Sequence, residues 1–86
     1  MKYMRIEINK YIVADTEICD GKPTFKGTRI MVWQVLEMLR AGVHPKEIMT
    51  SFAVPLRKEH IQAALQYAAD LMKGGDNVQF SIPLKA

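Results

Sequence analysis

The chain has 86 residues, of which 49% are hydrophobic and 24% are charged, and its formal net charge is +3. This length and composition fit one ordered domain and exclude a disordered chain. A single cysteine, Cys19, excludes an intramolecular disulfide and a cysteine-rich metal framework. The positive charge is compatible with nucleic acid as a partner, but also with simple solubility.

The amino terminus, MKYMRIEINKYIVAD, lacks the apolar core of a secretory signal, and no apolar run reaches the length of a membrane span. We therefore expect a cytoplasmic protein that does not enter a membrane.

Residues 3 to 30 are predicted to form an irregular β region. Polarity alternates over residues 3 to 8, which is typical of a half-buried strand, and YIVAD at 11 to 15 is a second short apolar run. Three brief β-type pieces follow, with the sequences EIC, PTF and TRIMV.

The segment GKPTFKGTRI at residues 21 to 30 combines glycines with positive charge, as phosphate-binding loops do. It lacks the glycine spacing of those loops, so its glycines are better explained by two tight turns. Turn geometry does not explain Lys22, Lys26 and Arg29. These cations are either solvated surface or contacts to a DNA backbone.

Three helices are predicted after residue 30. The first follows an apolar stripe at helical spacing, made by Val32, Val35, Leu36 and Leu39, and Gly42 ends it. The second is short, about 45 to 52, and begins at Pro45. The third carries Ile61, Ala64, Leu65, Ala68 and Leu71 or Met72 on one face and ends at Gly74 and Gly75.

The predicted fold is a single, mainly α domain over residues 1 to 86. A three-helix helix-turn-helix bundle over 31 to 73 forms its core, with the short β region before it. The tail over 74 to 86 can form a strand from Val78 to Ile82, which could pair with the amino-terminal strands or with another chain.

Nothing in the sequence assembles a catalytic site, so we expect no enzyme, no cofactor and no metal. His44 and His60 have no carboxylate or thiol at a ligand spacing, and His44 is expected to act as an N-cap before Pro45. Asp20 beside Cys19 disfavours a reactive thiolate, so Cys19 is read as a packing residue.

The third helix begins with RKEH, which places Arg57 and Lys58 in a first turn whose dipole prefers acids. Either this end binds nucleic acid, with His60 and Gln62 on the exposed side as readers of base edges, or the mismatch is simply tolerated. Trp33 lies off the apolar stripe and either covers the β region or meets a partner. Phe80 and Ile82 of the tail are further candidates for a partner interface.

The stretch from about Ile18 to Leu71 resembles the prokaryotic family called domain of unknown function 433. The resemblance is carried by G-K-P and G-T-R-I at 21 to 30, A-G at 41 and 42, P-x-E-I at 45 to 48 and A-L-x-Y-A-A at 64 to 69. It departs at Arg57, where the family usually has Thr or Ser, which makes this helix start more basic.

The resemblance implies a homeodomain-like or winged trihelical fold and an antitoxin role of the VapB type. Such antitoxins silence a PIN-like ribonuclease and repress their own operon by binding operator DNA. We therefore expect a DNA-binding antitoxin that acts as a homodimer. The alternative is a protein-protein interaction module without DNA binding, and salt dependence of binding separates the two.

Overall fold

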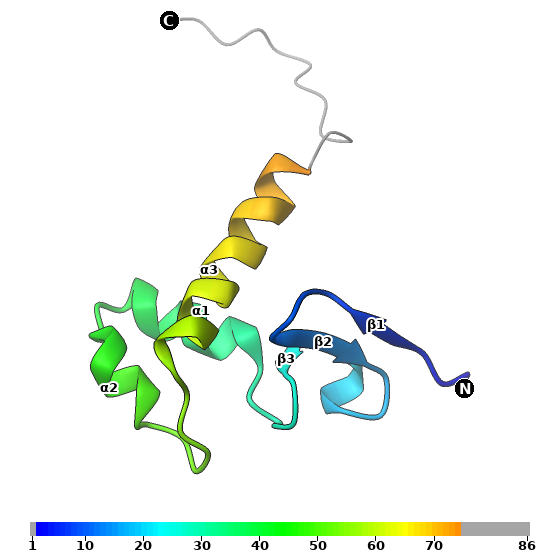
Figure 1. Ribbon diagram of the computed structural model, residues 1–86, viewed down its shortest axis with the longest axis horizontal. Coiled ribbons are helices and arrows are strands. Elements are labelled where there is room, and N and C mark those ends of the chain that lie inside the picture. The colour runs from blue at the N-terminus through cyan, green and yellow to red at the C-terminus, as the bar shows by residue number, and fades with distance from the viewer. Residues whose placement is uncertain (1, 75–86) are drawn as a thin grey trace, which may run out of the picture.

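The computed structural model describes residues 2–74, which form a three-stranded antiparallel sheet and three α-helices (Figure 1). Strands β1 (Arg5–Glu7), β2 (Ile12–Asp15) and β3 (Thr24–Phe25) lie in the sheet in chain order. Ile6 pairs with Ala14 between β1 and β2, and Ile12 pairs with Phe25 between β2 and β3. The sheet is therefore a meander with β2 in its centre.

Between β2 and β3, the chain makes a tight turn, η1 (Cys19–Gly21). The β-type piece EIC predicted just before it, at residues 17 to 19, is wrong, because these residues form no strand and Cys19 has a φ of 51°, in the left-handed region that no strand uses. The Lys22 N–H donates to the Cys19 carbonyl over 3.1 Å and closes the turn. The turn redirects the chain from the end of β2 into β3.

The helices are α1 (Val32–Arg40), α2 (Pro45–Met49) and α3 (Lys58–Lys73). Gly42 follows α1 with a φ of +89°, and the N–H groups of Gly42 and Val43 donate to the carbonyls of Leu39 and Met38. These two bonds form a Schellman motif, which satisfies carbonyls that the helix end leaves free. The predicted helix stop at Gly42 is thus confirmed.

The core lies between the sheet and the helices. It is built from both parts of the chain, and its buried members are Ile12, Phe25, Ile30, Val32, Val35, Ile48, Leu56, Ile61 and Ala64. Only the first half of α3 contributes buried residues, and the second half projects away from the sheet (Figure 1). Leu71 and Met72, expected on the buried face, are 60% and 84% exposed.

Strand β1 is exposed along its length and is tied to its neighbours by charged groups. The Asp15 carboxylate, only 4% exposed, accepts from Tyr3 Oη and Arg5 Nη1, each at 2.9 Å. Arg5 Nε also bonds Glu7, and Glu7 in turn pairs with Lys26 just beyond β3. These ion pairs form a continuous charge chain that joins β1 to β2 and to the residue just beyond β3. Its members are Asp15, Arg5, Glu7 and Lys26.

The predicted fold class, a mainly α helix-turn-helix bundle of the homeodomain-like or winged kind, is wrong. The finding that overturns it is the antiparallel sheet of β1, β2 and β3, which makes this a small α/β fold. The sheet is no appendage, because Ile12 and Phe25 are fully buried in the core that the helices share. The predicted tail strand at 78 to 82 lies outside the described residues.

Candidate nucleic-acid interface

Three cations gather where α2 and α3 approach each other. Lys46 lies in α2, Arg57 is the N-cap of α3, and Lys58 is the first residue of α3. All three are exposed and, within residues 2–74, none forms an ion pair. We call Lys46, Arg57 and Lys58 the basic surface.

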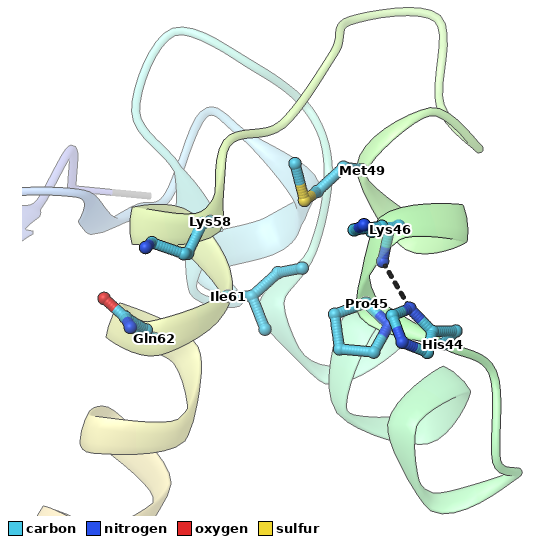
Figure 2. Close-up of a pocket in the computed structure, with 7 residues that line it drawn as sticks. All are labelled: His44, Pro45, Lys46, Met49, Lys58, Ile61 and Gln62. Atoms are coloured by element: carbon cyan, nitrogen blue, oxygen red, sulfur yellow. Dashed lines mark hydrogen bonds between the residues drawn. The ribbon is translucent and has the colours of Figure 1, made fainter.

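Beside the basic surface lies a hollow of about 380 Å³, which we call the α2–α3 groove. Figure 2 shows Lys58 and Gln62 on the α3 side and Lys46 on the α2 side. Its other lining residues are His44, Pro45, Met49 and Ile61. Of the predicted DNA contacts, the structure therefore brings Lys58 and Gln62 together at one groove, with Arg57 adjoining them in the chain.

The start of α2 is fixed by local chemistry. His44 caps the helix, and its Nδ1 accepts from the Lys46 N–H at 3.1 Å, which Figure 2 marks. Pro45 follows at the first helical position, where the absent N–H costs no hydrogen bond. The predicted capping role of His44 is confirmed, and it sets the position of Lys46 at the groove.

His60 does not occupy the exposed position expected of a base reader. Its ring is half-buried and meets the rings of Tyr11 and Phe25 edge-on, with centroids 5.1 and 5.5 Å away. Its Nδ1 accepts from the Arg57 backbone N–H at 3.0 Å, which caps α3. Burial, and then the charge of Arg57, lower the pKa of His60 below its ordinary value. His60 therefore supports the basic surface from behind.

The cations of GKPTFKGTRI lie in three different surroundings. Lys26 pairs with Glu7 of β1, and Arg29 is exposed while its carbonyl faces the Cys19 thiol, with Sγ at 3.5 Å. Lys22 lines a second hollow. None of the three lines the α2–α3 groove. These three cations are close together in the sequence, but the turns on either side of β3 place them in different parts of the surface.

The second hollow, of about 390 Å³, lies between α1 and the second half of α3, and we call it the α1–α3 groove. Trp33 is half exposed on its rim, and Trp33 Nε1 donates to Met31 Sδ at 3.3 Å. The other lining residues are Lys22, Pro23, Val32, Leu36, Tyr67, Ala68 and Leu71. The remaining predicted partner residues, Phe80 and Ile82, lie outside the described range.

Sequence reasoning missed Lys46, Tyr67 and Leu71 as groove residues. Lys46 lies within the predicted second helix, and its place directly after Pro45 in a first turn is a usable signal. The spacing of Leu71 fits the apolar stripe of the third helix, but spacing does not show where the opposing surface ends.

The described residues contain no group of three His, Cys, Asp or Glu side chains placed to hold a metal ion. Between residues 2 and 74, no helix is both long and apolar enough to cross a membrane.

A family model described as Protein of unknown function (DUF433) matches residues 12–68, which is more than half of the chain. No curated protein and no solved structure matches the chain. The matched range runs from β2 into α3 and includes every lining residue of the α2–α3 groove and all but Leu71 of the α1–α3 groove.

Proposed function

From the premise that the chain belongs to the DUF433 family, we propose that it binds duplex DNA as an antitoxin-like regulator. The observation that carries the proposal is the basic surface, with three exposed cations from two elements and no ion pairs among the described residues. Ionic contacts to phosphates supply most sequence-independent DNA affinity, and unpaired cations are free to make them. Gln62 adds a side-chain amide that can read a base edge.

In this proposal the protein is a cytoplasmic homodimer that holds operator DNA, represses its own operon and neutralises a PIN-like ribonuclease. Its own residues carry no catalysis and need no cofactor. The α1–α3 groove is the surface proposed for the nuclease, because it is apolar and exposes Trp33, a residue type enriched at protein interfaces.

The first prediction concerns the double variant Arg57→Ala with Lys58→Ala. The variant retains the Arg57 backbone N–H that His60 accepts, so we expect it to fold. Its affinity for duplex DNA from the chain's own promoter region should fall about tenfold or more at low salt. The slope of log affinity against log salt should become shallower by about two for each protomer. A mobility-shift titration at several salt concentrations measures both.

The matched control is Lys2→Ala with Lys73→Ala, which removes the same net charge at two other exposed cations. It should retain near-wild-type affinity. Wild-type protein that fails to bind at low salt, or two double variants that bind equally, would refute the proposed DNA contact.

A second candidate function is a protein-protein interaction module, favoured by the apolar α1–α3 groove. The PIN-like ribonuclease proposed as partner is the probe, and Trp33, the only tryptophan, reports binding by fluorescence. Binding that persists at high salt, together with no DNA binding, would select this alternative.

A further inference from the structure

The sheet has one open edge within the described part of the chain, and it is the outer edge of β1. The outer side of β3 is occupied: Thr24 forms a bridge with Met31, and the Phe25 N–H donates to the Ile30 carbonyl at 3.1 Å. Strand β1 has β2 on one side and no strand on the other among residues 2–74. An unpaired strand edge is a template for another strand.

The backbone groups at this edge belong to two charged residues. The Thr16 N–H donates to the Met4 carbonyl at 2.9 Å, and the Ile8 N–H donates to the Ile12 carbonyl at 3.0 Å. Backbone groups of successive strand residues alternate in direction. The N–H and C=O groups of Met4, Ile6 and Ile8 therefore point toward β2. The N–H and C=O groups of Arg5 and Glu7 are therefore directed outward.

The charges of β1 select one way for two copies of the strand to pair. A two-fold axis at Arg5 sets arginine opposite arginine, and an axis at Glu7 sets glutamate opposite glutamate, and both arrangements are destabilising. An axis at Ile6 sets Arg5 of each copy opposite Glu7 of the other. It also lets these outward-facing residues exchange both of their backbone hydrogen bonds.

We propose that β1 is the dimerisation strand, and that two copies of this chain pair antiparallel through β1 about a two-fold axis at Ile6. The two sheets then join into one six-stranded sheet. The inference rests on the homodimer of the proposed function, but it does not depend on DNA.

Apolar side chains support the same register. Met4 and Ile6 are 55% and 56% exposed in the single chain and lie on the same face, two positions apart. With the axis at Ile6, the two copies of Ile6 face each other as a pair without direct hydrogen bonds, in which side chains come closest. Met4 of each copy then faces Ile8 of the other. The pairing therefore covers apolar surface on one face of β1 and sets opposite charges across from each other on the other face.

Disulfide trapping tests the register. In a Cys19→Ser background, Ile6→Cys places one thiol in each chain next to the two-fold axis. Opposed Cα atoms of such a pair lie about 4.5 Å apart, which a disulfide spans. We expect mild oxidation of the purified protein, without nucleic acid, to convert most of the chain to a covalent dimer on a non-reducing gel.

The matched control is Met4→Cys in the same background, because Met4 has nearly the same exposure on the same face of β1. In the proposed register, the two copies of Met4 stand four residues apart along the strands, roughly 13 Å, which exceeds disulfide reach. Little cross-linking is expected.

Sedimentation and circular dichroism accompany the gel. Wild-type protein should sediment as a dimer, and Ile6→Asp should sediment as a folded monomer, since two carboxylates meet at the axis. Three results overturn the inference: equal cross-linking of the two cysteine variants, no cross-linking of folded Ile6→Cys, or a dimeric Ile6→Asp. No DNA is present in these experiments, so their outcome does not test the DNA-binding proposal, which the mobility-shift titration tests separately.

Discussion

His60 and Lys58 stand two positions apart at the start of α3 and have opposite surroundings. Lys58 is exposed at the groove, while the His60 ring is half-buried against Tyr11 and Phe25. The sequence alone could not separate them, because both are polar residues in the first turn of an amphipathic helix. The difference comes from the sheet: the rings of Tyr11 and Phe25 lie where the third residue of α3 packs, and that residue is His60.

The pKa of His60 leads to a prediction about pH. Burial lowers this pKa in the folded chain, and the unfolded imidazole takes up its proton near pH 6.5. Below that pH the unfolded state binds more protons than the folded state, so the free energy of unfolding should fall as pH drops from 7 to 5. Above pH 6.5, the stabilising contribution of neutral His60 to the free energy of unfolding is fully present. Urea unfolding at a series of pH values measures this.

The comparison variant is His60→Gln, because glutamine at this position can also accept from the N-cap N–H. It should be less stable at pH 7, where it loses the aromatic contacts, but its stability should change much less between pH 7 and 5. A variant with the same pH dependence as the wild type would show that another group is responsible.

At the scale of elements, three helix boundaries follow from local hydrogen bonds and backbone geometry. α1 ends at the Schellman turn of Gly42, α2 begins at His44 and Pro45, and α3 begins where His60 accepts from Arg57. Signals of this kind depend on neighbours in the chain, so the sequence predicted where all three helices lie. Strand pairing depends on residues far apart in the chain, which is why the sequence predicts only an irregular β region.

The Gly42 turn gives a prediction for an element boundary. At a φ of +89°, Gly42→Ala brings the new Cβ close to the following carbonyl oxygen, although it meets no residue beyond its chain neighbours, and should lower the free energy of unfolding by about 1 kcal/mol. Gly42→Asn should cost less, because asparagine tolerates the left-handed region better. Chemical denaturation of both variants checks the order. Equal losses would mean that φ is not the cause.

At the scale of the molecule, the two proposals combine into a prediction about salt. Each protomer carries three cations in the basic surface, so the slope of log affinity against log salt is expected to be about −2.7 per protomer and about −5.4 for the dimer. The Ile6→Asp monomer should therefore bind DNA with about half the wild-type slope. Titration of both proteins on one duplex measures it, and equal slopes would contradict a dimer that presents two basic surfaces together.

The sequence predicted the family and one part of the candidate site, the start of α3. It could not predict the fold class, because the fold class depends on whether Ile12 and Phe25 pack into the same core as the helices. Short apolar runs in a sequence do not show what they pack against. It also grouped Lys22, Lys26 and Arg29, which lie close in the chain. Their different surroundings are set by turns whose geometry depends on the assembled sheet.

The charge chain of Asp15, Arg5, Glu7 and Lys26 has a consequence for the order in which this fold comes apart. Strand β1 buries none of its residues, so ionic bonds and one backbone ladder hold it, whereas packing holds β2. Lys26 and Arg5 lower the pKa of Glu7, so the chain of charges stays intact until the solution is distinctly acidic. In the Ile6→Asp monomer, salt or acid can then release β1 in a local opening that leaves the core closed, and amide hydrogens of β1 would exchange with solvent before those of β2.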